Sequence, residues 1–298
     1  MAPGHEIAGV VVAVGSDVKN FKVGDHAGVG CMVDSCGTCD ECSIHEEQFC
    51  GAGKCVFTYG TKFLTQEYEG SEGHVTQGGY TKYIVTKEKF TLKIPMNLDL
   101  AAAAPLLCAG ITVYSPMVQH GLKPHMTLGV VGMGGLGHMA VKIGKAMGCH
   151  VTVVSRNNAK KKTCIEDLKA DNFIDMSNPD EVKASAKNFN MIINTISAKY
   201  DVNAYANMLK CHGKMIIVGA PPEPLQLSSM SLIFGSKTIA GSLIGGIKET
   251  QEMLDFCGQH NVLCQIEMIQ PEQIRETHDR IVKGDVYYRA VIDMTKVE

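Results

Sequence analysis

The sequence has no apolar run that approaches the ~20 residues needed to cross a bilayer, and it has no excess of positive charge. Its 28 Lys and Arg residues against 31 Asp and Glu residues give a formal net charge of -3, so it offers no basic field for nucleic acid. It also lacks a secretory signal, internal repeats and low-complexity segments. We therefore expect a cytoplasmic globular protein with no nucleic-acid and no membrane partner.

The length and composition are those of an ordinary globular protein with roughly two domains and a substantial core. The chain has 298 residues, of which 45% are hydrophobic and 20% charged. The first hundred residues favour β-structure, with a buried strand expected over 7–15 and a turn followed by a strand over 73–85.

After residue 100 the pattern changes to an alternation of strands and helices. Short, continuously apolar runs predict strands at 127–131, 150–154, 190–194 and 214–218. Helical spacing is found over 136–147, 158–170, 201–210, 249–259 and 271–283, and a last strand is expected over 287–294. Runs that are apolar throughout are typical of strands covered on both faces of a parallel sheet. This part of the chain therefore predicts an α/β fold with a doubly wound parallel sheet.

Four cysteines lie close together in the sequence. Two residues separate Cys36 from Cys39, two more separate Cys39 from Cys42, and Cys50 follows after a further seven residues. Such spacing suits four thiolates around one tetrahedral zinc, and an all-cysteine site is typical of structural zinc. The alternative is a set of disulfides, which the twelve cysteines without a secretory signal disfavour.

A glycine-rich turn is predicted between the strand at 127–131 and the following helix. It reads Gly132-Met133-Gly134-Gly135-Leu136-Gly137, a Gly-x-Gly-x-x-Gly pattern. In this context the glycines permit a tight turn and a close approach of the backbone to a pyrophosphate, which the helix N-terminus then binds. The alternative is a glycine-rich loop without a ligand, and the strand and helix units that follow make it the weaker one.

The end of the second strand indicates which dinucleotide binds. A carboxylate there would hydrogen-bond the ribose hydroxyls of NAD and repel a 2′-phosphate. The sequence instead has Ser155 and Arg156, followed by Lys160, and both cations suit a doubly charged phosphate. We therefore predict NADP, although either cation alone could simply solubilise the start of a helix.

A second metal site is suggested by His5, Glu6 and Cys108. Taken singly, each is ambiguous, because a lone histidine is more often a satisfied polar group and a lone cysteine a small hydrophobe. His5 and Glu6 precede the first predicted strand, whereas Cys108 lies at the junction between the two halves of the chain.

Motifs along almost the whole chain resemble the zinc-dependent medium-chain alcohol dehydrogenases, and within them the cinnamyl alcohol dehydrogenase group with its bacterial NADP-dependent aldehyde reductases. These include Pro3-Gly-His-Glu-Ile7, the four-cysteine lobe and the glycine turn. The other matching segments are 21–31, 78–80, 105–116, 241–253 and 285–293. The resemblance implies a Rossmann domain together with a GroES-like β domain.

The resemblance also assigns roles to single residues. It makes His5 and Cys108 ligands of a catalytic zinc, with Glu6 able to enter or leave the coordination, and Cys36, Cys39, Cys42 and Cys50 ligands of a structural zinc. It implies domains at 1–107 (GroES-like, with the zinc lobe), 108–246 (NADP-binding) and 247–298 (the return to the catalytic domain). The residues expected to contact NADP are Thr112, Gly132, Met133, Gly134, Gly135, Leu136, Gly137, Ser155, Arg156, Lys160, Thr195, Gly219, Ser242, Leu243 and Ile244.

The chain also departs from the family pattern. In the family, a strand-rich segment before Pro-Gly-His-Glu supplies the first cysteine ligand of the catalytic zinc and part of the substrate pocket. This sequence begins after that point, so we expect a truncated GroES-like domain with an incomplete catalytic zinc site and an uncovered apolar face. A truncated product, an alternative start and a misassigned start codon all fit this expectation.

The predicted activity is hydride transfer between NADP(H) and a primary alcohol or aldehyde, with zinc as a Lewis acid. The alternative is an inactive, NADPH-binding, dimer-forming remnant in which the structural zinc remains and the catalytic zinc is lost. A zinc-free quinone reductase is disfavoured, since that branch lacks the cysteine lobe. The family habit further implies a homodimer formed through an edge near 232–242.

Overall fold

The structure of the protein is a computed structural model, which describes residues 1–62 and 74–297. The chain forms two compact units. The first consists of Met1–Ile111 and Ile244–Glu298, and the second of Thr112–Leu243. The boundaries predicted from the sequence, 107/108 and 246/247, lie close to these positions.

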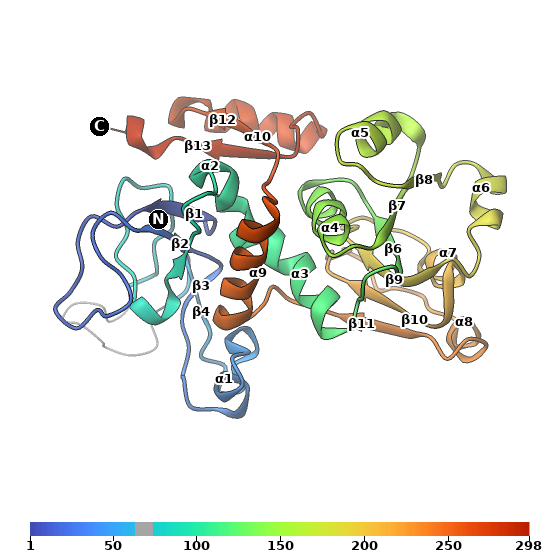
Figure 1. The fold of residues 1–298 in the computed structure, drawn as a ribbon, viewed down its shortest axis with the longest axis horizontal. Helices are drawn as coiled ribbons and strands as arrows, with labels where there is room; N and C mark the ends of the chain where they lie inside the picture. The colour runs from blue at the N-terminus through green and yellow to red at the C-terminus, as the bar shows by residue number, and fades with distance from the viewer. Residues whose placement is uncertain (63–73, 298) are drawn as a thin grey trace. The chain divides into compact units, whose positions relative to one another are not determined.

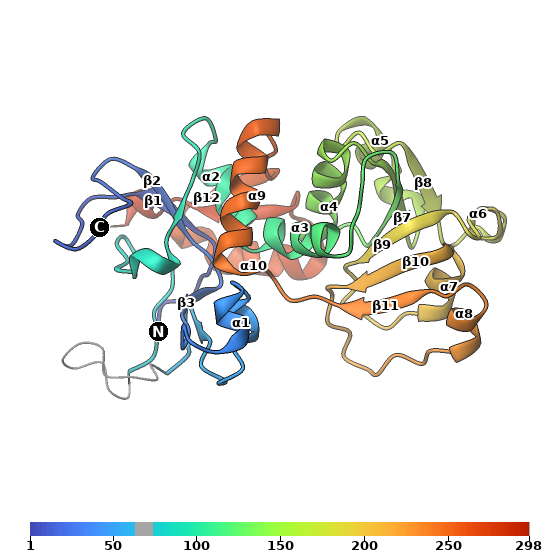
Figure 2. The ribbon, with the colours of Figure 1, turned by 60° about the horizontal axis from the view of Figure 1, so that its bottom comes forward.

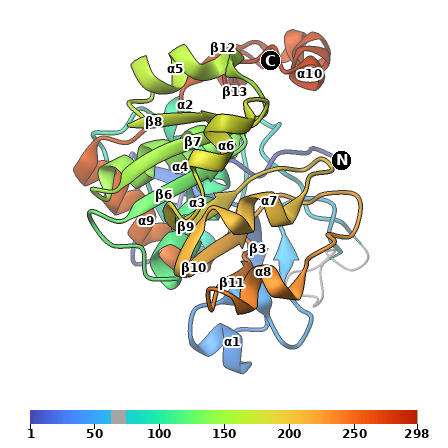
Figure 3. The same ribbon diagram turned by 90° about the vertical axis from the view of Figure 1, so that its right-hand side faces the viewer.

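The second unit contains a six-stranded sheet in which every neighbouring pair is parallel. The strand order is β11-β10-β9-β6-β7-β8, which Figure 3 shows from β8 at the top to β11 at the bottom. This is the order of a doubly wound nucleotide-binding sheet, with the direction of winding reversed between β6 and β9. The strands are β6 (Thr127–Val131), β7 (His150–Ser155), β8 (Asn172–Asp175), β9 (Phe189–Asn194), β10 (Leu209–Ile217) and β11 (Thr238–Gly241).

Helices cover both faces of this sheet (Figure 2). On one face, side chains of α6 and α7, such as Val182 and Tyr205, pack on the strand residues Val154 and Ile192. On the other face α4 lies against β6 and β7. The helices and 3₁₀ turns are α3 (Ala109–Gln119), which begins in the first unit, α4 (Gly135–Ala146), η4 (Asn158–Lys160), α5 (Lys161–Glu166), α6 (Pro179–Ala184), α7 (Val202–Asn207) and α8 (Ser229–Ile233).

Two predicted helices are shorter than their spacing suggested. The helix expected over 158–170 ends at Glu166, and Lys169 then adopts a left-handed backbone with φ of 60°. The helix expected over 201–210 ends at Asn207, because Leu209 already pairs with Phe189 in the sheet. In both places pairing or turning of the backbone outweighs local helical preference.

The first unit is built from small sheets and short helices. β1 (Ile7–Val10), β2 (His26–Val29) and β5 (Leu92–Lys93) form one antiparallel sheet. β3 (Met32–Asp34) pairs with β4 (Val56–Phe57), and β12 (Ile266–Ile269) with β13 (Arg289–Ile292). The remaining elements are α1 (Asp40–Ser43), η1 (Glu47–Phe49), η2 (Glu88–Phe90), α2 (Leu100–Ala103), η3 (Ala104–Leu107), α9 (Ile247–His260), η5 (Pro271–Gln273), α10 (Ile274–Lys283) and η6 (Met294–Lys296).

The β-rich prediction for the first hundred residues overestimated the regular structure. The first strand ends at Val10, and beyond it Val12 and Val14 are 63% and 44% exposed. Over 74–85 the described residues form no named strand, only an isolated bridge between Val75 and Lys62. The beginning of that predicted segment, at residue 73, lies outside the described residues.

Among the described residues, no single helix has both the length and the apolar composition of a membrane span. One bent pair, Leu100–Leu107 with Ala109–Gln119, reaches that length and composition when the two are taken together.

Candidate metal and cofactor sites

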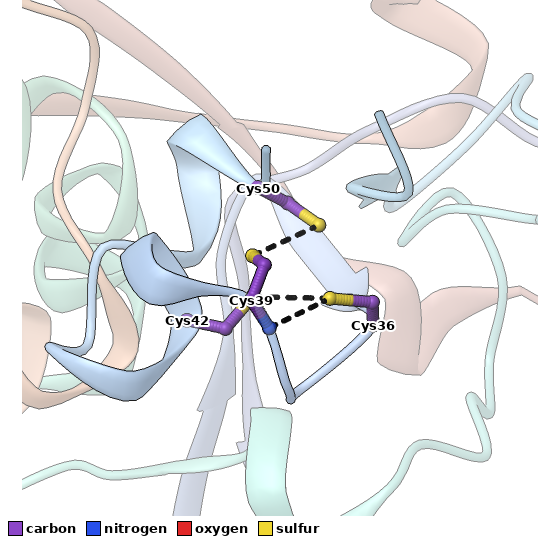
Figure 4. A group of neighbouring side chains, drawn as sticks. All are labelled: Cys36, Cys39, Cys42 and Cys50. Carbon is purple, nitrogen blue, oxygen red and sulfur yellow. Dashed lines mark hydrogen bonds between the residues drawn. The ribbon is translucent and has the colours of Figure 1, made fainter. Parts of the chain in front are cut away.

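The four-cysteine lobe lies between β3 and β4 and contains α1 (Figure 1). Cys39 is the N-cap of α1, and Cys42 is buried within this helix. Cys36 precedes the helix, and Cys50 follows the 3₁₀ turn η1. The turns of the lobe thereby point four sulfur atoms toward one another (Figure 4).

The spacing of these sulfurs fits zinc. All four lie within 4.8 Å of one another, and the Cys36–Cys42 and Cys39–Cys50 sulfur pairs are each 3.9 Å apart. Four sulfurs at about 2.3 Å from a tetrahedral zinc would be about 3.8 Å from one another. The predicted structural zinc ligands are therefore together in a geometry that a zinc ion can occupy with at most small side-chain movements.

Backbone amides stabilise negative charge in this lobe. The N–H groups of Thr38 and Cys39 donate to the Cys36 sulfur at 3.5 and 3.4 Å, and these bonds lower the pKa of Cys36 to about 6. Burial raises the pKa of Cys42 to about 12. Cys36 thus favours the thiolate form that zinc binds, and zinc would displace the proton of Cys42 on binding.

A second group of metal-binding side chains gathers His5, Cys31 and Cys108. One donor atom from each residue lies within 4.8 Å of the other two, and all three side chains are partly buried. His5 precedes β1, Cys31 lies between β2 and β3, and Cys108 follows η3. Three segments far apart in the sequence therefore contribute one donor each.

The contact between Gly30 and Leu107 positions the two cysteines. A Cβ atom on Gly30 would lie 2.9 Å from the Leu107 carbonyl oxygen, so only glycine permits these two backbone segments to approach this closely. Cys31 follows Gly30 in the sequence and Cys108 follows Leu107. The Cys31 sulfur lies 4.0 Å from the Leu107 carbonyl oxygen. The close backbone contact therefore brings the two thiols side by side.

His5 is held by the backbone of the segment at 78–80. The N–H groups of Gly78, Gly79 and Tyr80 donate to the carbonyls of Ala2, Gly4 and Pro3 at 2.7 to 3.0 Å. The His5 ring stacks on Tyr59, with ring centroids 5.8 Å apart and planes inclined by 8°. Both contacts restrict the orientation of the imidazole before any metal binds.

The charges in this cluster are coupled. A hydrogen bond from the Cys31 thiol and the proximity of His5 lower the pKa of Cys108 to about 4. The same hydrogen bond, together with burial, raises the pKa of Cys31, and the hydrogen bond to Cys108 raises the pKa of His5. The hydrogen bond from Cys31 and the nearby His5 therefore favour negative charge on the Cys108 sulfur.

Glu6 lies beside this cluster but is not one of its three donors. Its carboxylate accepts a hydrogen bond from the Arg289 guanidinium at 2.7 Å. Burial raises the pKa of Glu6 to about 7, which Arg289 opposes. The third donor is instead Cys31, which was not among the ligands predicted from the sequence. Its position five residues before the four-cysteine motif gave no ligand spacing by which to recognise it.

A cysteine pair with one histidine is the donor set of catalytic zinc sites that keep one coordination position open. Nitrogen and sulfur ligands of a tetrahedral zinc would be about 3.3 to 3.8 Å apart. The separations of up to 4.8 Å in the cluster are close to this range. The three residues present therefore fit a zinc ion with small side-chain movements.

The predicted glycine turn lies between β6 and α4, on the line where the winding of the sheet reverses. Gly132 has a φ of 90°, and a Cβ atom there would lie 2.6 Å from the Thr195 hydroxyl. At Gly137 a Cβ atom would overlap the Gly132 carbonyl. At Gly134, by contrast, an added Cβ atom would meet no other atom within 4 Å. The first and last glycines thus close the turn, and the middle one leaves space beside the backbone.

The end of β7 adds positive charge to this turn. The Lys160 ammonium donates to the Met133 carbonyl at 2.8 Å, which fixes the lysine across the glycine turn. Ser155 is the last residue of β7, and Arg156 follows it as an exposed side chain. No carboxylate occupies the end of this strand, in agreement with the sequence.

The remaining residues expected at the cofactor are distributed as follows. Thr195 follows β9 and donates to the Val131 carbonyl at 2.9 Å, which links the two strands at the reversal. Gly219 follows β10, in backbone contact with Ile196. Of the other expected contacts, Thr112, Ser242 and Leu243 belong to the second unit and Ile244 to the first.

The sequence matches two family models. Residues 1–96 match the alcohol dehydrogenase GroES-like domain, and residues 135–259 match the zinc-binding dehydrogenase domain. A probable cinnamyl alcohol dehydrogenase 6 from Oryza sativa subsp. japonica is 47% identical over 298 residues, which cover 99% of this chain and 80% of the relative. The chain belongs to the zinc-dependent medium-chain alcohol dehydrogenases, in the cinnamyl alcohol dehydrogenase group.

Solved structures agree with this family. A cinnamyl alcohol dehydrogenase from Sorghum bicolor superimposes with a TM-score of 0.93 at 42% identity, and the match covers 100% of this chain and 82% of the other. A cinnamyl alcohol dehydrogenase from Helicobacter pylori, solved in complex with NADP(H), gives a TM-score of 0.89 at 40% identity over 99% and 82% of the two chains. The predicted combination of a GroES-like domain with a Rossmann domain is confirmed, and this medium-chain dehydrogenase is an oxidoreductase.

Proposed function

We propose that this medium-chain dehydrogenase transfers a hydride between NADP(H) and a primary alcohol or aldehyde at a zinc-dependent site. The observation that carries the proposal is the cluster of His5, Cys31 and Cys108, whose donor set is that of a catalytic zinc with an open position. Zinc bound there would act as a Lewis acid toward an aldehyde or alcohol oxygen.

The protein groups have separate tasks in this proposal. His5 and the Cys108 thiolate hold the metal, and the Arg289 guanidinium holds Glu6 beside it in the position shown by their 2.7 Å contact. The glycine turn accepts the cofactor pyrophosphate on its backbone amides. Ser155, Arg156 and the Lys160 ammonium bind the 2′-phosphate through charge-assisted hydrogen bonds.

The activity is tested by following NADPH oxidation with cinnamaldehyde and benzaldehyde, together with zinc content. Two zinc ions per chain and turnover with NADPH support the enzyme. The alternative function is an inactive NADPH-binding remnant, for which one zinc, cofactor binding and no turnover are expected. The second donor cluster favours the enzyme.

Cofactor choice is tested by Arg156→Ala and Lys160→Ala. Each removes a charge-assisted hydrogen bond worth about 1.5–3 kcal/mol, so we expect the Kd for NADPH to rise about 10- to 100-fold while that for NADH changes little. Lys162→Ala is the matched control, because the Lys162 side chain is 83% exposed and pairs only loosely with Glu166 at 3.9 Å. Equal losses for NADPH and NADH would contradict the assignment to the 2′-phosphate.

We also propose that the chain forms a homodimer along β11. This strand is at the edge of the six-stranded sheet, and Ile233 and Phe234 nearby in the sequence are 67% and 81% exposed. An edge strand with exposed apolar neighbours favours pairing with a second chain. Light scattering of Phe234→Glu against the unchanged protein tests this, and a mass unaffected by the substitution would contradict it. A cytoplasmic location remains a prediction.

A further inference from the structure

We propose that Cys31 is the third protein ligand of the catalytic zinc in this chain. In the family pattern the corresponding cysteine comes from a segment before Pro-Gly-His-Glu, whereas Cys31 follows His5 in the chain. The inference rests on the proposed function, because it assumes that a zinc ion binds at His5 and Cys108.

Cys31 has the chemistry and the position that a ligand needs. Its sulfur is within 4.8 Å of donor atoms on both His5 and Cys108. Among the residues that the structure describes, only this group and the four-cysteine lobe bring three or more donors together at this range. No carboxylate belongs to the group, since Glu6 is engaged by Arg289.

The backbone fixes Cys31 independently of any metal. β2 pairs with β1 and with β5 on its two sides, and Gly30 at its end is pressed against the Leu107 carbonyl. The Thr58 hydroxyl also donates to the Gly30 carbonyl, and the Thr58 N–H donates to the Cys31 carbonyl at 3.1 Å. Both peptide groups around Cys31 are therefore held by hydrogen bonds, so the Cys31 side chain extends from a backbone position that is fixed before any metal binds.

With Cys31 included, the site has two thiolates and one imidazole. Three protein ligands are what an open catalytic zinc site normally has. Without Cys31 the metal would have only His5 and Cys108 as donors in this cluster. Cys31 thus supplies the ligand by which the site changes from a weak two-donor site to a stable three-donor one.

The first experiment measures zinc per chain in the unchanged protein and in Cys31→Ala. We expect two zinc ions in the unchanged protein and about one in the variant, with the zinc affinity of the second site lowered more than ~100-fold, beyond the 10- to 100-fold cost of losing an outer-shell partner. Cys31→Asp, which retains a ligand atom, should recover part of the second zinc. Cys211→Ser is the matched control, because Cys211 is exposed and belongs to neither cluster, and it should keep both ions.

A second measurement avoids substitution. X-ray absorption at the zinc edge of the fully loaded protein counts sulfur ligands, and four in one site with two in the other average three sulfurs per zinc. If Cys31 does not ligate, the average falls to two and a half. This result decides the question even if Cys31→Ala fails to fold.

The outcomes separate the two proposals. Two zinc ions in Cys31→Ala with unchanged affinity, or two and a half sulfurs per zinc, would overturn the role of Cys31 while the catalytic zinc itself stands. A single zinc in the unchanged protein, unaffected by His5→Ala, would overturn the catalytic metal site and the role of Cys31 together. Loss of the second zinc in both His5→Ala and Cys31→Ala supports both.

Discussion

The two thiol-rich clusters of the first unit differ in how the chain assembles them. The four cysteines of the lobe all lie between residues 36 and 50 and are brought together by one short helix and its turns. His5, Cys31 and Cys108 come from three separate segments, and those of Cys31 and Cys108 are in close backbone contact where Gly30 touches Leu107. The first site depends on local spacing and the second on tertiary packing.

The two clusters also differ in whether a bound zinc could take part in a reaction. Four thiolates complete the coordination of zinc and leave no position for a substrate, whereas three donors leave one position open. The local site can therefore only stabilise its lobe. The three-donor site of His5, Cys31 and Cys108 can take part in a reaction, but it depends on the packing of the whole unit.

The largest effect is expected when a ligand is removed from the four-cysteine site. Cys39→Ser removes one of four ligands, and we expect loss of the structural zinc and unfolding of the lobe. The cost in free energy should be several kcal/mol, below the ~10–16 kcal/mol of apparent zinc binding in zinc-finger peptides. Zinc analysis and limited proteolysis between residues 36 and 50 measure this. Unchanged protease resistance in a zinc-depleted variant would show that the lobe folds without its metal.

A chelator should distinguish the two sites without any substitution. The three-donor site is expected to release zinc first, because its open position admits the chelator. Aldehyde reduction should then fall about 1000-fold, since a Lewis acid contributes several kcal/mol to the reaction, while one zinc and most of the thermal stability remain. Added zinc should restore the rate. Simultaneous release of both ions would contradict the distinction.

The packing that assembles the three-donor site can be disturbed by a substitution at Gly30. A Cβ atom there meets the Leu107 carbonyl at 2.9 Å, so Gly30→Ala should cost about 1–3 kcal/mol, as overpacking usually does, and should weaken the second zinc while the structural zinc stays. Gly9→Ala in β1 is the matched control, because nothing lies within 4 Å of its added atom. Denaturant unfolding and zinc titration measure both variants, and equal behaviour of the two would refute the role of the contact.

The smallest effect is expected when an ion pair beside the four-cysteine lobe is removed. The Lys87 ammonium pairs with Asp34 at 2.7 Å, just before the lobe, and its side chain is 40% exposed. Lys87→Met should therefore cost about 0.2–1 kcal/mol, with less difference at high salt and no change in zinc content. If the structural zinc were lost with this ion pair, the lobe would depend on tertiary packing after all.

Features that depend on local sequence were predictable. Apolar runs identified the strands of the parallel sheet, and the glycine pattern located the turn between β6 and α4. The spacing of Cys36, Cys39, Cys42 and Cys50 identified the lobe. The failures arose where backbone pairing overrode local preference, as at Leu209, which pairs with Phe189 instead of ending a helix.

The sequence by itself determined the fold class, the glycine turn and the closed four-cysteine site, because each depends on residues a few positions apart. Only the tertiary structure decided that Cys31, rather than Glu6, joins His5 and Cys108. No spacing rule relates three residues on separate segments. Their meeting depends on the absence of a side chain at Gly30, which permits the backbones that carry Cys31 and Cys108 to come into contact.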